Sequence, residues 1–159
     1  MKSNPLSLDA YRKALIGLPV FHVWRGYGSA LFVEFGEHHP TGKQDGAPGN
    51  PSGDITLMIE WSWRIEKPRS ILGGSWSAEK RWPGMFKKLL GANVSDIQFI
   101  GYLPEIEVSL SNGLRIVSFM TAEGQPAWAL ICRTTPKGTL CVRRGKLYEQ
   151  ERVIADQIE

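Results

Sequence analysis

Hydrophobic and polar residues alternate most regularly over residues 55–66, ITLMIEWSWRIE. Successive side chains of a strand point to opposite faces, so this pattern predicts one continuous strand with a buried face. Trp61 and Trp63 are therefore expected to point into the core. The predicted inward face carries Ile55, Leu57, Ile59, Trp61, Trp63 and Ile65. The predicted outward face carries Thr56, Met58, Glu60, Ser62, Arg64 and Glu66.

Shorter patterns predict the remaining elements. Helical spacing of apolar residues predicts helices over residues 8–16 and 83–90, which Gly17 and Gly91 would end. A frayed helix is expected over the charged tail, 147–159. Further strands are predicted at residues 20–25, 30–35, 69–76, 94–100, 105–110, 114–120, 127–133 and 139–143.

Residues 36–54, GEHHPTGKQDGAPGNPSGD, carry almost nothing apolar. Glycine, proline, asparagine and aspartate interrupt regular structure, so this composition predicts a long exposed loop.

Cys132 and Cys141 flank a predicted turn. Their positions depend on the register in which the strands at 127–133 and 139–143 pair. A three-residue loop with Gly138 at its left-handed position places Cys132 opposite Val142. A two-residue turn would instead pair the cysteines, but it would mix the apolar and polar faces of both strands. The first register places the thiols on opposite faces, where they cannot form a disulfide.

The two halves of the chain follow a similar pattern. Residues 15–36 and 89–113 each begin with two aliphatic residues and a glycine, and continue through a Gly-Tyr pair into an alternating strand. We interpret this as a pseudo-duplicated helix-plus-meander unit, with halves at about 7–76 and 77–145. The predicted fold is a single α+β domain over residues 1–159, mainly antiparallel β-meanders with two short helices and one shared core.

The second half also resembles a known group of proteins. Gly91 and Val94, the alternating strands, the Ser111-Asn112-Gly113 hairpin and the Trp128 strand look like small uncharacterised bacterial β-rich domains. Some domains of this kind are immunity proteins of polymorphic toxin systems. The resemblance covers residues 85–135, and more faintly 12–65. It implies protein binding, and it supplies no catalytic residues.

Composition narrows the function further. The 159 residues are 42% hydrophobic and carry a net charge of +3, with six Trp and six Phe. This balance fits a globular domain, and the weak, scattered positive charge gives no reason to expect nucleic-acid binding. The sequence shows neither a signal-peptide core nor an apolar run of about 18 residues, so we expect a cytoplasmic protein that does not bind membranes.

Candidate chemistry is sparse. His38 and His39 are adjacent, which is poor chelating geometry, so we expect neither a metal nor a cofactor. Glu105 and Glu107 share a strand face and could act with His22 in a hydrolase. An exposed sheet face explains the carboxylates equally well.

The favoured hypothesis is a non-enzymatic protein-binding module with a site on an open sheet face and the 36–54 loop. Its candidate residues are Met58, Glu60, Arg64, Glu66, His38 and His39. The alternative is a small-molecule pocket between the halves, lined by Trp24, Trp61, Trp63 and Trp128. Exposed strand edges also make a homodimer an option.

Overall fold

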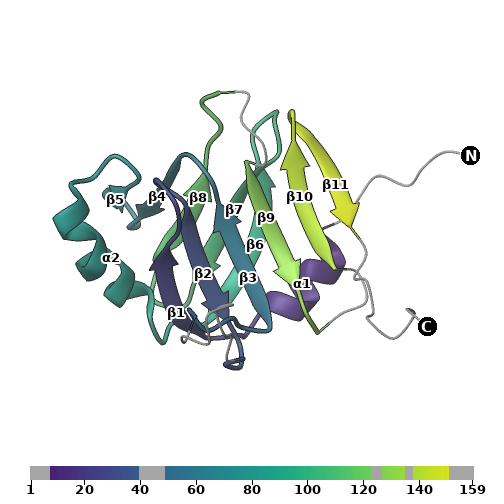
Figure 1. Ribbon diagram of the computed structural model, residues 1–159, viewed down its shortest axis with the longest axis horizontal. Helices are drawn as coiled ribbons and strands as arrows, with labels where there is room; N and C mark the ends of the chain where they lie inside the picture. Colours follow the sequence, from purple (N-terminus) through teal and green to yellow (C-terminus); the bar gives the residue numbers. More distant parts are fainter. Residues whose placement is uncertain (1–7, 40–48, 123–126, 135–137, 151–159) are drawn as a thin grey trace, which may run out of the picture.

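The computed structural model describes residues 8–39, 49–122, 127–134 and 138–150. Within these residues the fold is α+β and mainly antiparallel β, as predicted (Figure 1). The predicted strands at 20–25, 94–100, 105–110 and 139–143 have the observed bounds. The elements are α1 (Asp9–Leu15), β1 (Val20–Arg25), β2 (Leu31–Phe35), β3 (Ile55–Ile59), β4 (Trp63–Glu66), β5 (Ile71–Gly74), the 3-10 helix η1 (Glu79–Arg81), α2 (Trp82–Leu89), β6 (Val94–Ile100), β7 (Glu105–Leu110), β8 (Arg115–Ser118), β9 (Trp128–Cys132), β10 (Thr139–Arg143) and β11 (Lys146–Gln150).

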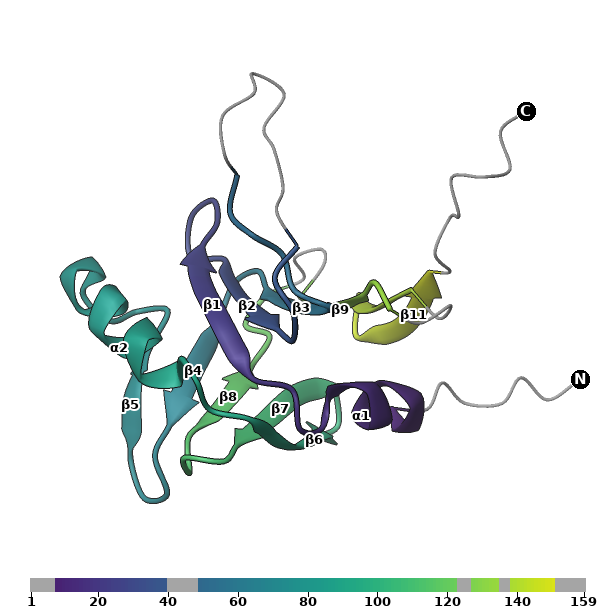
Figure 2. The same ribbon diagram turned by 90° about the horizontal axis from the view of Figure 1, so that it is seen from below.

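The strands form two sheets, which Figure 2 shows as two layers. The first has the order β1-β2-β3-β9-β10-β11, and the second has the order β5-β4-β8-β7-β6. Helix α2 packs against β1, and α1 packs against β6. Tyr11 of α1 also donates a hydrogen bond to Glu149 of β11 at 3.0 Å. Helix α2 thus lies beside β1 of the first sheet, and α1 lies beside β6 of the second sheet.

The expectation of one strand over residues 55–66 is wrong. Strand β3 pairs with β2 and β9 in the first sheet, whereas β4 pairs with β5 and β8 in the second. The chain changes sheets through Glu60, Trp61 and Ser62, and the Trp61 side chain is 52% exposed. Both strands bury one face in the same core, so the alternation continues across the crossing and conceals it.

The two sheets are joined where the segments after the two helices meet. The Gly17 amide donates to the Val94 carbonyl and the Gly91 amide to the Val20 carbonyl, both at 2.8 Å. The Val20 amide donates to Ala92, and the Val94 amide donates to Leu18. Both glycines have positive φ, 87° and 81°, which side-chain-bearing residues rarely adopt. The contacts are reciprocal, and they connect β1 of one sheet to β6 of the other.

Trp63 and Trp128 are fully buried in the core between the sheets. A buried indole N–H needs an acceptor. Trp63 Nε1 donates to the carbonyl of Ser29 at 2.7 Å, and Trp128 Nε1 donates to that of Pro104 at 2.8 Å. Each acceptor lies in the turn of a hairpin, β1–β2 or β6–β7, so the indoles fix both turns to the core.

The register predicted for the cysteine hairpin is also wrong. Leu130 lies opposite Leu140, and the Cys132 amide donates to Gly138, so Cys132 is not opposite Val142. The observed register keeps the same side chains on the same faces, because it differs from the prediction by an even number of residues. The two buried cysteines therefore lie on opposite faces of the sheet. Residues 135–137 of the turn lie outside the described part.

The first part of the charged tail is a strand. Residues 146–150 form β11, which pairs along its whole length with β10. The helix predicted from residue 147 is therefore wrong up to residue 150, and residues 151–159 lie outside the described part. In the structure Leu147 and Glu149 are less exposed than their neighbours, but the sequence Lys-Leu-Tyr-Glu-Gln shows no matching apolar alternation.

Trp128→Phe should lower the free energy of unfolding by about 1–3 kcal/mol, because the Pro104 carbonyl loses its donor and the core loses volume. Urea unfolding followed by circular dichroism measures this change. The control is Trp61→Phe, which alters a half-exposed indole and should cost less than about 0.5 kcal/mol. Equal costs for the two variants would contradict the assigned role of Trp128.

Candidate functional site

Several connections between strands gather at one end of the molecule, at the top of Figure 1. Ser29 Oγ in the β1–β2 turn donates to the Trp61 carbonyl at 2.8 Å. Phe119, after β8, donates its amide to Ser62, and Glu60 donates its amide to Ala127. We call this region the crossover end; it includes residues 26–30, 60–62, 75–76, 101–104, 119–122 and 143–145.

Large aromatic side chains are exposed at the crossover end. Tyr27, Trp76 and Tyr102 are almost fully exposed, and Trp61 is about half exposed. Leu103 adds a further exposed apolar side chain. Exposed apolar side chains are ordinary when they are scattered, but a group of them indicates a contact surface.

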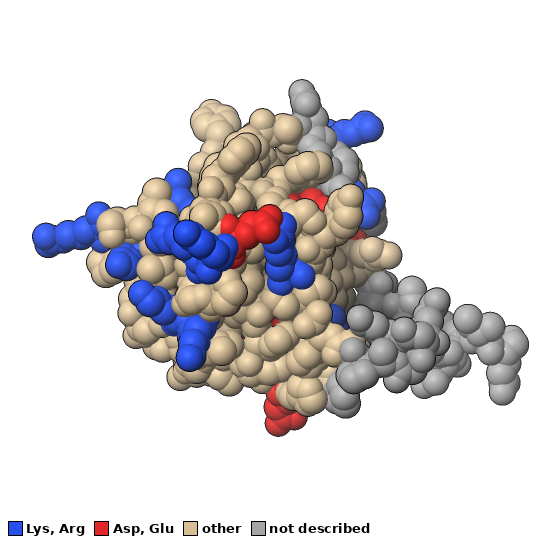
Figure 3. Space-filling view, turned by 60° about the vertical axis from the view of Figure 1, so that its left-hand side comes forward, with Lys and Arg blue, Asp and Glu red and all other residues tan. Residues whose placement is uncertain are grey.

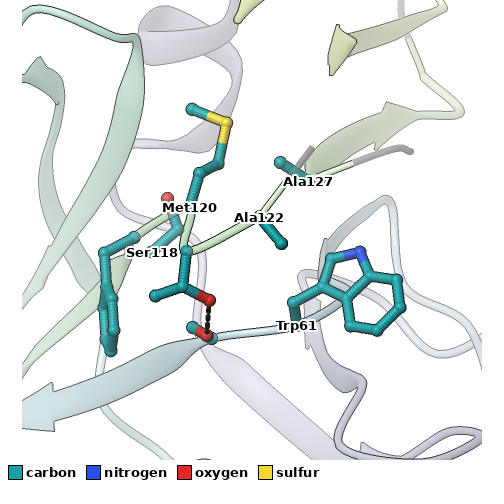
Figure 4. A pocket seen from close by; sticks show the side chains of 8 residues that line it. Trp61, Ser118, Met120, Ala122 and Ala127 are labelled. Atoms are coloured by element: carbon teal, nitrogen blue, oxygen red, sulfur yellow. Dashed lines mark hydrogen bonds between the residues drawn. The ribbon is translucent and has the colours of Figure 1, made fainter. Parts of the chain in front are cut away.

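A small hollow opens beside Trp61 (Figure 4). Ser118 at the end of β8 lines it, together with Met120 and Ala122 from the segment that follows. Ser62 Oγ lies 3.1 Å from Thr121 Oγ1 in its wall. Its enclosed space is about 10 Å³, roughly enough for one water molecule, and reaches about 220 Å³ only when the open solvent at its mouth is counted. Sites for small organic ligands usually span roughly 300–1,000 Å³. The hollow is therefore too small for such a ligand and forms a shallow depression beside Trp61.

A buried carboxylate, Glu105, lies near Ser118 and Met120, two of the residues that line the hollow. Both carboxylate oxygens of Glu105 are buried without a hydrogen-bond partner among the described residues. Burial raises the pKa of the Glu105 carboxyl, although the nearby Met120 amide and Ser118 hydroxyl act in the opposite direction. Glu105 lies on β7 and His22 on β1, in different sheets, so they do not form the acid–base group considered above.

The residues predicted to share one polar strand face are divided between the two sheets. Met58 lies on β3, with Phe32 and Ala129 opposite it, and Glu60 follows at the crossing. Arg64 and Glu66 lie on β4 in the second sheet. The expected common surface is therefore wrong, for the same reason that the single long strand was wrong.

Arg64 and Glu66 belong to an ion-pair network across the second sheet. Arg64 Nε lies 2.8 Å from Glu66, and Arg115 lies 3.3 Å from Glu66 and 3.8 Å from Glu107. Gln98 also donates to Glu107. Cross-strand charge pairs of this kind support a sheet. Because these residues pair with one another, the network has a structural explanation.

The histidines lie near the two ends of the predicted loop. His39 Nε2 lies 2.7 Å from Asp54 Oδ1, and this contact lowers the pKa of the Asp54 carboxyl. The His38 ring packs edge-on against Phe21, and His22 Nε2 lies 3.1 Å from Asn50 Oδ1. No group of three or more His, Cys, Asp and Glu side chains within the described ranges is arranged to hold a metal ion. Residues 40–48 lie outside those ranges.

The four tryptophans proposed to line one pocket occupy three environments. Trp63 and Trp128 are core residues, and Trp61 is half exposed at the crossover end. Trp24 lies on β1, stacks on Phe32 at 4.0 Å between ring centroids, and donates its N–H to the buried Glu34. Of the four, only Trp61 lines the hollow.

Sequence reasoning missed Tyr27, Trp76 and Tyr102. A signal was available, because each tyrosine follows a glycine in a predicted turn, where a side chain has no strand face to cover it. Trp76 appeared to end a strand, and only the early end of β5 at Gly74 leaves it exposed.

The comparisons with known proteins add no relative. The chain matches no protein-family model, and it matches no curated protein or solved structure. Among the described residues, no helix has the length and apolar character needed to cross a membrane.

Glu105→Gln should raise the free energy of unfolding at about pH 8 and change it little at about pH 4. A carboxyl with a raised folded-state pKa loses stability as the pH rises from its unfolded to its folded pKa, because the folded protein holds the proton more tightly. The amide carries no charge and removes that loss. Melting temperatures measured across this pH range test the effect.

Glu107→Gln is the matched control for this experiment. It removes the carboxylate beside Arg115 and should lower the melting temperature at the higher pH. If Glu105→Gln gave no gain at high pH, Glu105 would not be a destabilising buried charge.

Proposed function

We propose that this protein is a non-enzymatic protein-binding module whose contact surface is the crossover end. The observation that carries the proposal is that four exposed aromatic side chains, Tyr27, Trp61, Trp76 and Tyr102, belong to the crossover end, with a small hollow beside Trp61. Tryptophan and tyrosine are enriched among the residues that contribute most of the binding energy at protein interfaces.

The scaffold supports this role. The β1–β2 and β6–β7 turns, which carry Tyr27 and Tyr102, are each fixed to the core by a buried indole. Side chains presented by fixed turns lose less conformational entropy on binding than side chains on loose loops. The contact surface is therefore largely formed before a partner arrives.

The crossover end replaces the open sheet face as the proposed site. The Arg64 and Glu66 side chains already pair within the sheet, whereas the exposed aromatics have no comparable packing role. The small-molecule alternative loses support, since Trp63 and Trp128 fill the core and the hollow is small. Neutralising a toxin by direct binding, which the resemblance of the second half implies, is one form that this function takes.

We also propose that the two halves are copies of one unit. Tyr27 and Tyr102 follow Gly26 and Gly101 in equivalent turns, and the strand order β1-β2-β3-β9-β10 corresponds to β6-β7-β8-β4-β5. Both β1–β2 and β6–β7 have a register shift near the start, at Val20/His22 and Val94/Asp96. On this proposal, each copy contributes one exposed tyrosine to the contact surface.

Photo-crosslinking in cells of the native host tests the proposed surface. Benzoylphenylalanine replacing Tyr27 or Tyr102 should capture one specific protein, because these side chains would lie in the interface. Ile16 and Ile71, which are exposed in other parts of the molecule, are the control positions and should not capture it. The proposal fails if the control positions capture the same protein as efficiently, or if the tyrosine positions capture none.

Binding measurements with the purified captured protein give the energetic test. Trp61→Ala and Tyr102→Ala should each weaken affinity roughly 10- to 100-fold, because hot-spot aromatics cost about 2 kcal/mol or more when truncated. Ile71→Ala should change affinity less than about 2-fold. Isothermal titration calorimetry measures all three. Equal effects of all three variants would place the interface elsewhere.

A further inference from the structure

A basic surface adjoins the crossover end along η1 and α2. Lys80, Arg81, Lys87 and Lys88 are all exposed, and we call these four residues the cation cluster. Figure 3, which brings this side of the molecule forward, shows many more Lys and Arg side chains than Asp and Glu. Trp76, on the segment that joins β5 to η1, connects the cluster to the crossover end.

The charges of the cluster are not compensated within the described residues. The acidic side chain between β5 and the end of α2 is Glu79, and it already pairs with Arg25 at 3.0 Å. The Arg25 guanidinium also lies over the Trp82 ring, 4.6 Å from its centroid, which holds this pair against α2. No ion pair of the four clustered cations occurs within the described ranges.

Two of the four cations lie where a helix disfavours them. Lys80 and Arg81 immediately precede α2, and the first turn of α2 contains no acidic residue. The start of a helix carries a partial positive charge, so cations there are unfavourable, whereas Lys87 and Lys88 suit the last turn. Helix electrostatics explains Lys87 and Lys88, and Arg81 donates a hydrogen bond to the Leu72 carbonyl at 3.4 Å. Neither explanation applies to Lys80 within the described residues. Such local conflicts are expected at functional sites.

We infer that the cation cluster selects a protein partner with an acidic surface beside its apolar anchor. The inference rests on the proposed function and adds the charge of the partner. Attraction between complementary surfaces accelerates encounter and rejects wrong partners, while the aromatic contacts supply affinity. A polypeptide fits better than single-stranded nucleic acid, because stacking of successive bases needs several aromatic platforms along the basic path, and along this one Trp76 is the exposed indole.

Fluorescence anisotropy with labelled poly-L-glutamate tests the charge selectivity. The intact protein should bind this probe, and binding should weaken as salt is added. The variant Lys80→Glu/Arg81→Glu/Lys87→Glu/Lys88→Glu should bind at least roughly 10-fold more weakly. The control, Lys13→Glu/Lys67→Glu/Arg69→Glu/Lys146→Glu, makes the same change in net charge at exposed positions on other elements and should lose less than about 3-fold. Circular dichroism confirms that both variants fold.

Three results would overturn the inference. The first is that the intact protein does not bind poly-L-glutamate, and the second is that both variants lose the same affinity for it. The third is that the protein binds an oligothymidylate or an anionic vesicle more tightly than poly-L-glutamate. The outcome is separate from that of the proposed function. If crosslinking at Tyr27 captures a partner that the cluster variant binds as tightly as the intact protein, the crossover site stands and the acidic-partner inference fails.

Discussion

The meeting of residues 17–20 with residues 91–94 is the constraint on which the rest of the structure depends. Four backbone hydrogen bonds join these segments, and two glycines with positive φ let each helix turn directly into its strand. Strands β1 and β6, which begin the two meanders, both leave this junction. The junction therefore fixes the position of β1 relative to β6. The chain then crosses between the sheets at the other end, where the exposed aromatics lie.

Two core tryptophans fix the turns that form part of the crossover end. Trp63 follows the crossing from β3 to β4, and Trp128 begins β9, where the chain has returned from β8 to the first sheet. Their N–H groups hold the β1–β2 and β6–β7 turns. The loss of either hydrogen bond would therefore affect stability and the placement of Tyr27 or Tyr102 together. This coupling is a reason to expect the crossover end to keep one shape on binding.

Charge is used differently on the two polar surfaces of the molecule. On the second sheet, Arg64, Glu66, Arg115 and Glu107 pair with one another, so the charges stabilise the strands and leave little for a partner. Along η1 and α2, the cation cluster forms no ion pairs with the described part of the chain. A list of charged residues cannot separate these two uses, because the difference lies in what faces each side chain across strands or helices.

The sequence by itself determined the fold class, both helices and most strands, because apolar periodicity and helix-ending glycines act locally. It also determined that the Trp63 side chain points into the core, because the alternation of apolar and polar residues continues from β3 into β4 although the two strands belong to different sheets. Only the tertiary structure decided that residues 55–66 belong to two sheets, that Trp61 is half exposed, and that Tyr27, Trp76 and Tyr102 lie at one end. These features depend on which strands pair across long sequence separations, and a single sequence does not encode that pairing in its local pattern.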